Sequence, residues 1–276
     1  MKGAPMVVYL ALGWMIVVFA IALGADLFSP YDYMAMDLRA RLAPPAFLGG
    51  TWLHLLGTDE LGRDVLSRLI QSTRTSLVVA LIGTAVGACL GTAIGLAAAR
   101  YRGFVDDVVL AAIDFQTALP FLILALAALA FLDGSFVVLV ALMGIYGWER
   151  YARIVRALTL SAQTRGYAIA LRVLGASPMR LYLRHILPNI ASAIIVNVTL
   201  TFPEIILLET SLSFLGIGIQ PPATSLGNMV GFGRDYLLTA WWIAVAPSIV
   251  IFLTTLSLSL LGDRLRDHFD PALRVA

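Results

Sequence analysis

The sequence contains few charged residues and a single cysteine. Only 13% of its 276 residues are charged, whereas 60% are hydrophobic and the mean hydropathy is +0.89. This composition places the chain among membrane proteins. A net charge of +2 gives no indication of a nucleic-acid partner. Cys89, alone within an apolar run, excludes an internal disulfide.

Motifs that hold metals, phosphates or catalytic nucleophiles are also missing. His54, His185 and His268 are far apart in the sequence, which gives a zinc site little support. The chain contains no G-x-x-x-x-G-K-[ST] phosphate loop, no H-E-x-x-H zinc motif and no G-x-S-x-G nucleophile turn. We therefore expect no catalytic residue, no metal ligand and no cofactor on this chain, and predict that it is not an enzyme.

Long apolar runs, by contrast, are abundant, and several approach the length needed to cross a bilayer. The fold class is predicted to be all-α, a polytopic membrane protein with about six transmembrane helices. The first run ends in Ala20-Ile21-Ala22, which resembles a signal-peptide cleavage site, but its length favours an uncleaved span. The predicted spans are residues 6–23, 75–99, 108–132, 135–148, 186–214 and 241–261.

The run at residues 135–148 is short for a crossing, and the distribution of arginines decides how it is interpreted. If this run crosses the membrane, the arginines that follow it lie in the cytoplasm, as the positive-inside rule favours. We therefore predict a crossing, with both termini cytoplasmic. The arginines concerned are Arg150, Arg153, Arg156, Arg165, Arg172, Arg180 and Arg184. Five arginines before the second span are exceptions to the rule, because they fall on the predicted outer side: Arg39, Arg41, Arg63, Arg68 and Arg74.

These spans divide the chain into two predicted parts. Residues 1–74 are expected to form the first transmembrane helix and an external N-terminal region. Residues 75–276 are expected to form a five-helix core with a cytoplasmic loop at residues 150–187.

Glycines recur at every fourth residue in the second predicted span and therefore line one face of its helix. Small residues at this spacing let another helix approach closely in lipid, where packing drives association. Packing within the chain's own bundle is favoured over a contact with another subunit. The four positions are Gly83, Gly87, Gly91 and Gly95.

Three carboxylates fall within predicted spans, where an ionised side chain is costly and is therefore a candidate functional group. Asp114, Glu204 and Glu209 are candidate residues of a translocation path. Asp114 has an equally supported alternative, in which it pairs with a basic residue near the cytoplasmic interface. Pro120, in the same span, is expected to kink the helix.

A basic segment, residues 165–189, lies between two hydrophobic runs. Four of its residues fall at i, i+3, i+4 and i+7, the apolar stripe of an amphipathic helix: Tyr167, Ala170, Leu171 and Leu174. Gly175 is expected to end this helix in a left-handed conformation. Ser177 and Pro178 are typical of the start of a second helix, as its cap and its first residue. Arg180 and Arg184 then share one face of that second helix.

This segment resembles the cytoplasmic loop with which permease subunits of bacterial ABC importers dock onto their ATPase partners. The family pattern is Glu-Ala-Ala, three residues, Gly, nine residues and Ile-x-Leu-Pro. The glycine and the Leu-Pro pair are at the expected spacing, but Ile169 and His185 replace the glutamate and the final isoleucine. The matching stretch comprises Ile169-Ala170-Leu171, Gly175 and His185-Ile186-Leu187-Pro188.

Two further motifs resemble the C-type permeases of the dipeptide, oligopeptide and nickel branch of this family. The first comprises Gly57-Thr58-Asp59, Gly62-Arg63-Asp64, Ser67-Arg68 and Ser76-Leu77. Without the resemblance, it would be interpreted as a solvated surface helix with weak ion pairs. The second motif, without the resemblance, would be interpreted as a turn-rich external loop. It comprises Glu209, Ser211, Leu212, Ser213, Phe214, Leu215, Gly216, Gly218, Pro221, Pro222, Ser225, Gly227 and Asn228.

The resemblance implies a permease subunit of an ATP-driven importer in the bacterial inner membrane. Di- or oligopeptides are the expected substrate, with nickel, glutathione or another small solute as alternatives. The implied partners are a second, homologous permease, two cytoplasmic ATPase subunits that hold ATP and Mg²⁺, an extracytoplasmic substrate-binding protein, and the lipid bilayer. The predicted ATPase-docking residues are Tyr167, Ala170, Leu171, Leu174, Gly175, Ala176 and Arg180.

An ion-coupled secondary transporter is the alternative from a different class, with Asp114, Glu204 or Glu209 as proton carriers. Six spans without a detectable internal repeat suit a subunit of a larger complex better than a complete carrier. Dependence of uptake on ATP rather than on a proton gradient would separate the two.

Overall fold

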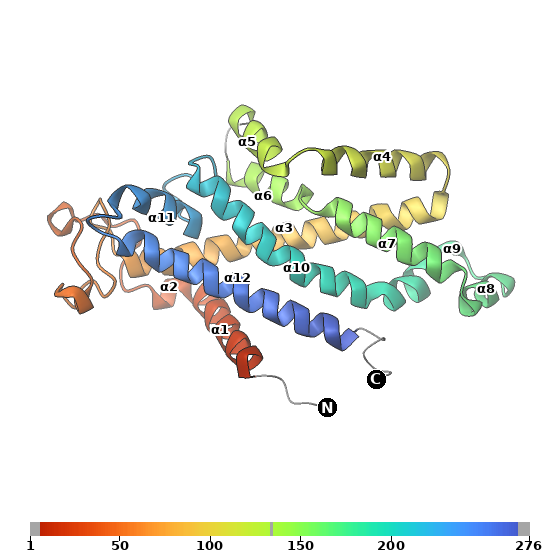
Figure 1. Cartoon of the computed structure of the whole chain (residues 1–276), viewed down its shortest axis with the longest axis horizontal. Coiled ribbons are helices and arrows are strands. Elements are labelled where there is room, and N and C mark those ends of the chain that lie inside the picture. Colours follow the sequence, from red (N-terminus) through yellow and green to blue (C-terminus); the bar gives the residue numbers. More distant parts are fainter. Residues whose placement is uncertain (1–5, 133–134, 270–276) are drawn as a thin grey trace.

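The computed structural model describes residues 6–132 and 135–269, which form an elongated bundle of long helices (Figure 1). The described residues contain no strand, only an isolated bridge between Thr58 and Asp64. The all-α prediction is confirmed. The helices are α1 (Met6–Leu23), α2 (Ala25–Phe28), α3 (Val65–Tyr101), α4 (Phe104–Ala118), α5 (Phe121–Phe131), α6 (Phe136–Ile145), α7 (Trp148–Gln163), α8 (Gly166–Val173), α9 (Pro178–Arg180), α10 (Leu187–Phe214), α11 (Leu226–Gly233) and α12 (Trp242–Phe269).

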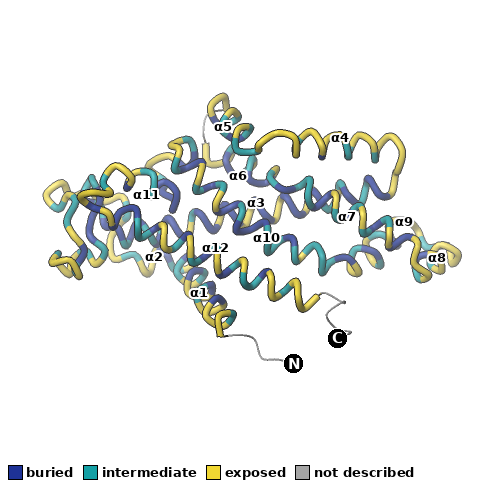
Figure 2. Tube along the Cα trace, in the orientation of Figure 1, coloured by how far each residue is buried: buried dark blue, intermediate teal, exposed yellow. Residues whose placement is uncertain are grey.

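Four helical segments are long and apolar enough to cross a membrane. They are α1, α3, α12 and the continuous helix Pro178–Phe214, which joins α9 to α10 through a π-helical segment, Leu181–Ile186. The pair α4 and α5 would make a fifth span. Figure 2 shows that the buried residues follow α3 and its neighbours, whereas the outer helices carry much of the exposed surface.

The third predicted span, residues 108–132, is bent rather than straight. α4 and α5 meet at an angle of 88°. Pro120, which has no amide to donate, precedes α5 as its N-cap residue. The kink predicted at Pro120 is confirmed, and an angle this large is that of a broken span or a re-entrant loop.

The fourth predicted span, residues 135–148, contains α6 but is longer than that helix. α6 has only 10 residues and ends before Gly147, whose positive φ of +81° interrupts the helix. The amphipathic α7 then continues along the same neighbour, α3. On its own α6 is too short to cross a bilayer.

The glycines of the second predicted span face α6 and α7. A β-carbon at Gly83 would lie 2.8 Å from Cβ of Met143, and one at Gly95 would lie 2.6 Å from the carbonyl oxygen of Ala152. Such approaches require glycine at the contact. Packing of this stripe within the chain's own bundle is therefore confirmed.

The first helix is an integral part of the bundle. Its buried residues form one stripe that faces α3 and α12: Ala11, Met15, Val18 and Ala22. Trp14 also donates a hydrogen bond from Nε1 to Thr254 Oγ1 at 3.2 Å. This packing joins α1 to two of the other long helices.

Two opposite ends of the bundle carry the sequence motifs (Figure 1). At one end, called here the α11 end, lie α2, α11 and the connection between α2 and α3. At the other, called the α8 end, lies the turn between α8 and α9. α3 begins at Val65 and runs through residue 74 without a break, so the predicted division of the chain at residue 74 falls inside a helix.

Candidate functional site

The two motifs of the C-type permeases, although about 150 residues apart in the sequence, meet at the α11 end. Ser76, from the first motif, donates a hydrogen bond from Oγ to Glu209 Oε2 at 3.0 Å. The same Oγ accepts a hydrogen bond from the amide of Leu226 at 3.2 Å. Ser72 Oγ and Thr224 Oγ1 are also hydrogen-bonded, at 2.8 Å. Side chains of α3 therefore tie together the segments on either side of the Pro221-Pro222 turn.

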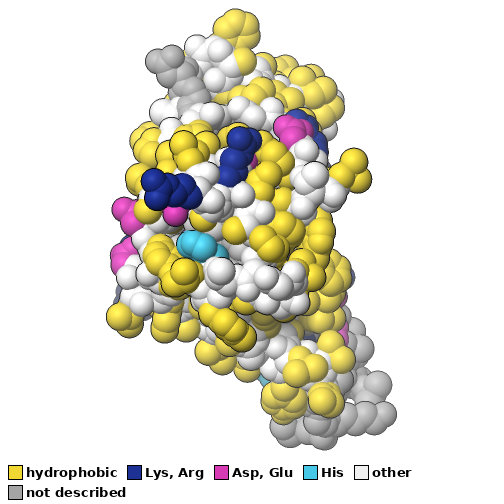
Figure 3. Space-filling view, turned by 90° about the vertical axis from the view of Figure 1, so that its left-hand side faces the viewer, with side chains coloured by type: hydrophobic (Ala, Val, Ile, Leu, Met, Phe, Trp, Pro, Cys, Tyr) yellow, Lys and Arg dark blue, Asp and Glu magenta, His cyan; other side chains and the backbone are white. Residues whose placement is uncertain are grey.

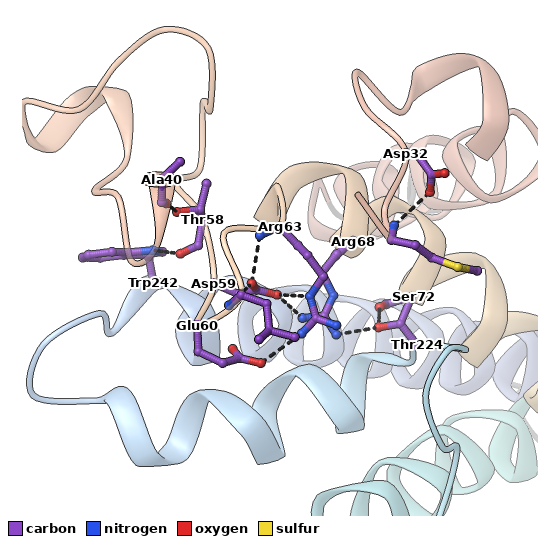
Figure 4. A network of polar contacts seen from close by, with 12 residues as sticks. Asp32, Ala40, Thr58, Asp59, Glu60, Arg63, Arg68, Ser72, Thr224 and Trp242 are labelled. Carbon is purple, nitrogen blue, oxygen red and sulfur yellow. Dashed lines mark hydrogen bonds and ion pairs between the residues drawn. The ribbon is translucent and has the colours of Figure 1, made fainter. Parts of the chain in front are cut away.

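Asp59 is the centre of a buried ionic network (Figure 4). Its Oδ2 accepts from Arg63 Nε at 2.7 Å and pairs with Arg68 Nη1, while Oδ1 accepts from the amides of Leu61 and Arg63, each at 2.9 Å. Arg63 Nη2 also pairs with Glu60 at 2.9 Å. Asp59 is 1% exposed and Arg68 is 4% exposed. The interpretation of this motif as a solvated helix with weak ion pairs is therefore wrong.

A second carboxylate of the same motif, Asp64, caps the start of α3. Its Oδ2 accepts from both the amide and the hydroxyl of Ser67 at 2.7 Å, and its Oδ1 lies 3.0 Å from Nδ1 of His54. Trp242, at the start of α12, donates from Nε1 to the carbonyl of Thr58 at 3.2 Å. The motif thus fastens the connection between α2 and α3 to two of the long helices.

Three of the five arginines that were exceptions to the positive-inside rule take part in ion pairs. Arg63 and Arg68 share Asp59, and Arg74 pairs with Asp26 at 2.9 Å. Figure 3, which views this end of the molecule, shows basic and acidic side chains close together among apolar ones. These arginines have a structural role that explains their presence at this end.

The segment after Glu209 folds back into the bundle. Ser213 donates from Oγ to the buried carboxylate of Glu209 at 2.7 Å and accepts from the amide of Ile219 at 3.2 Å. Asn228 donates from Nδ2 to the carbonyl of Ile219 at 3.2 Å. α11 then packs between α10 and α12, and a β-carbon at Gly227 would lie 2.5 Å from the carbonyl oxygen of Thr210. The turns of this motif therefore lie between α10 and α11 and are held by both helices, and the motif itself extends into each of them.

The three carboxylates of the predicted translocation path have different surroundings. Asp114 on α4 is exposed and pairs with Arg153 at 3.4 Å, which supports the alternative in which it forms an ion pair. Glu204 on α10 pairs with Arg150 at 2.9 Å. Glu209 is fully buried among the serines at the α11 end.

Successive arginines of α7 bind the neighbouring helices. Arg150 and Arg153 bind Glu204 of α10 and Asp114 of α4, and Arg156 pairs with Asp106 at the start of α4. The three arginines are spaced at three residues along an amphipathic helix. Their pairing fixes α7 between α4 and α10, a role that the sequence did not indicate because Asp106 carried no motif.

At the α8 end, the predicted apolar stripe is divided between two faces. Tyr167 and Leu171 are half-buried against an apolar cluster in the chain itself, whereas Ala170 is exposed and Leu174 is 81% exposed. The cluster comprises Val155, Ala162, Ala168, Leu181, Ile186 and Ile190. Ile169 and Val173, which lie at i and i+4 and are also exposed, extend the outward face. That second apolar spacing was present in the sequence but was not used in the prediction.

The turn predicted after α8 is confirmed. Gly175 has a φ of +76°, and the amide of Ala176 donates to the carbonyl of Leu171 at 3.0 Å. Ser177 accepts from the amide of Arg180 at 3.4 Å, with Pro178 in the first helical position. The second helix runs on without a break into α10. The wider π turn lies directly before Leu187-Pro188.

Comparisons with known proteins agree with this arrangement. The family described as "Binding-protein-dependent transport system inner membrane component" matches residues 91–275. The di/tripeptide transport system permease protein DppC of Pseudomonas aeruginosa is 38% identical over 95% of this chain and 87% of its own length. The dipeptide transport system permease protein DppC of Escherichia coli K12 is 38% identical over 99% of this chain and 90% of its own length.

A solved structure has a similar fold. A chain of the MetNI methionine ABC transporter, in an inward-facing conformation, has a TM-score of 0.56 over 73% of this chain and 96% of its own length, at 19% identity. At 19% identity, this similarity is evidence for a shared fold only. Together with the matching family and the relatives, it confirms the resemblance of the motifs: this chain belongs to the binding-protein-dependent inner membrane components, the permeases of ABC transporters.

Proposed function

We propose that this chain is a permease subunit of an ATP-driven importer of di- or oligopeptides. The names and identity of its relatives support this substrate class. A second, homologous permease would supply the other half of the path, and a substrate-binding protein would deliver the peptide at the α11 end. ATP and Mg²⁺ would bind to two cytoplasmic ATPase subunits at the α8 end, so both termini would be cytoplasmic.

The observation that carries the proposal is the outward apolar face of α8. Ile169, Val173 and Leu174 are exposed beside Gly175, at the tip of the bundle. Apolar side chains gathered on a short exposed helix are typical of a helix that enters a groove on a partner. Of the predicted docking residues, Ala170, Leu174 and Arg180 are exposed and free to contact an ATPase.

The half-buried residues of α8 have a different part in this proposal. Tyr167 and Leu171 pack on the cluster that contains Leu181, Ile186 and Ile190. These three belong to the continuous helix Pro178–Phe214. A displacement of α8 by an ATPase would therefore be transmitted directly to α10 rather than absorbed in a loose loop.

Leu174→Asp is expected to abolish association with the ATPase while leaving the chain folded. Because this side chain is 81% exposed, its replacement removes no internal packing. An aspartate would place a charge in an apolar groove, a substitution that costs several kcal/mol at an interface, or roughly a hundredfold or more in affinity. The measurement is co-purification of ATPase activity with the tagged chain, expressed with its candidate partners.

Leu238→Asp is the matched control for this experiment. Leu238 is fully exposed and lies near α11, at the opposite end of the bundle. The control should retain the ATPase. Equal ATPase recovery from the two variants would contradict docking through α8.

Gly175→Val is expected to uncouple transport from ATP hydrolysis. A β-branched residue at a φ of +76° costs about 1–2 kcal/mol in backbone strain, although no atom blocks its side chain. The turn would then relax and α8 would change its direction. Uptake of a radiolabelled dipeptide into proteoliposomes, divided by ATP hydrolysed, measures the coupling.

Gly166→Val provides the comparison, because Gly166 also has open space around it but an ordinary φ. This variant should keep the coupling ratio of the parent. Normal coupling in Gly175→Val, or an equal loss in both variants, would show that the turn conformation is not required.

The same proteoliposomes test the alternative functions. A dipeptide should compete with the labelled substrate, and nickel ions or glutathione should not. A secondary transporter would need a proton gradient instead of ATP. Asp114 and Glu204 are in ion pairs and Glu209 is hydrogen-bonded to Ser76 and Ser213, which does not favour them as proton carriers. Uptake that a proton ionophore abolishes in the presence of ATP would reverse this conclusion.

A further inference from the structure

Three arginines gather at the α8 end without a carboxylate partner. Arg100 and Arg102 close α3, and Arg172 lies on α8. None of the three forms an ion pair with a described carboxylate, although the arginines of α7 do. Asp106, which lies near Arg102, is already paired with Arg156. The positive charge here is therefore not balanced within the described part of the chain.

A buried glutamine holds two of these arginines in place. Gln163 Oε1 accepts from Arg172 Nη2 at 3.1 Å and from Arg102 Nη2 at 3.4 Å. Its Nε2 donates to the hydroxyl of Tyr182 at 2.9 Å and to the carbonyl of Ala99 at 3.2 Å. The glutamine can accept from arginines but cannot neutralise them. The two arginines are therefore held in place by hydrogen bonds and keep their positive charge.

These side chains line a cavity that continues into an apolar groove. Arg100, Gln163, Arg172 and Tyr182 are among the residues around a cavity of about 460 Å³. Beside it lies a groove of about 440 Å³ between α3 and residues 177–183. The two hollows share Arg100, Tyr101, Pro178 and Tyr182, and the groove wall beyond them is apolar, with Leu96, Ala97, Met179 and Leu183. The ligand that fits both has an anionic head and an apolar tail.

The position of these hollows along α3 agrees with the same ligand. The apolar run of α3 ends at Ala99, directly before Arg100, Tyr101 and Arg102. In a helix that crosses a membrane, this is the level of the lipid headgroups, where tyrosine and arginine are favoured. Basic pockets between helices at this level bind anionic headgroups. Arg100 also lies 5.1 Å from the ring centre of Tyr101 and 6.0 Å from that of Tyr182, which orients its guanidinium group.

We propose that this cavity and groove bind an anionic phospholipid, with the phosphate between Arg100 and Arg172 and an acyl chain between α3 and Met179–Leu183. The lipid would join the end of α3 to the start of the helix that continues into α10. The inference depends only on α3 crossing a membrane and not on the proposed transport function.

Native mass spectrometry of the full-length chain in detergent tests the proposal, with phosphatidylglycerol and phosphatidylcholine of identical acyl chains as probes. The complex with phosphatidylglycerol should form at a lower lipid concentration than the complex with phosphatidylcholine. Arg100→Gln/Arg172→Gln should weaken its binding by roughly thirtyfold, because each basic residue near an anionic headgroup contributes a factor of roughly five. Ala97→Trp, which fills the groove, should weaken the binding of both lipids.

Arg165→Gln/Arg184→Gln is the matched control, since both side chains are exposed at the same end and line neither hollow. It should retain phosphatidylglycerol like the parent chain, and both double variants should unfold at the temperature of the parent. An equal loss in the two double variants would overturn the proposal in favour of general charge attraction. Equal binding of the two lipids, or equally tight binding of glycerol phosphate alone, would also overturn it.

Discussion

Replacing Asp59 with asparagine is expected to lower the free energy of unfolding by about 3–5 kcal/mol. One carboxylate oxygen of Asp59 pairs with both Arg63 and Arg68, and Arg68 is 4% exposed. The other hydrogen-bond partner of Arg68 is the neutral hydroxyl of Thr224, at 3.5 Å. Without the carboxylate, the guanidinium group of Arg68 would remain buried without its directly paired charge, and only the more distant carboxylate of Glu60 would offset it.

Asp26→Asn provides a control with the same chemical change at the same end of the bundle. Asp26 is 79% exposed where it pairs with Arg74. Exposed pairs contribute little to stability, because water screens both charges. Thermal unfolding in detergent should therefore show a fall in Tm of about 6 °C or more for Asp59→Asn and of less than about 4 °C for Asp26→Asn. Equal shifts would mean that the network around Asp59 does not stabilise the fold.

Gly91→Val is expected to be the most damaging change in the centre of the bundle. A β-carbon at Gly91 would lie 2.6 Å from Cβ of Tyr151 and would also clash with the carbonyl oxygen of Trp148. Because one of these atoms is backbone, α3 and α7 would have to separate. Overpacking of this kind costs about 1–3 kcal/mol or more.

Ala85→Val tests whether the contact, rather than the added side chain, is responsible. Ala85 lies on the exposed side of the same helix. It should tolerate valine with a change in stability within about 0.5 kcal/mol. The fraction of monodisperse protein after mild heating, measured by size-exclusion chromatography, compares the two. Similar recovery of both variants would contradict the close packing of α3 on α7.

Periodicity and backbone chemistry predicted the elements with a local cause. The spacing of four glycines indicated the packed face of α3, and Gly175 and Ser177 indicated the turn after α8, because each acts on the backbone next to it. The kink at Pro120 has the same local origin. Such features can be predicted without knowing which distant segments pack nearby.

Features that depend on distant segments were predicted less well. Asp59 looked like a solvated residue because Thr224 and Trp242, which help to cover its surroundings, come more than 150 residues later. On α8, Tyr167 and Leu171 satisfy an apolar stripe, but so do Ile169 and Val173 on the other side. A spacing of three and four identifies a face without stating which face is packed. The acidic partners of the α7 arginines could not be assigned from the sequence, because these pairs join residues 39 to 54 positions apart.

The contrast between the two ends of the bundle has a mechanical consequence. At the α11 end, buried hydrogen bonds join α3 to α10 and to the start of α11, and a buried ion pair joins it to the connection between α2 and α3. At 37 residues, α3 is about 55 Å long. If the joined end acts as a pivot, a tilt of only about 5° moves the far end of this rod by about 5 Å, roughly one helical turn. With that pivot, α3 would act as a lever, in which a small rotation at the α11 end accompanies a displacement of about one helical turn at the α8 end.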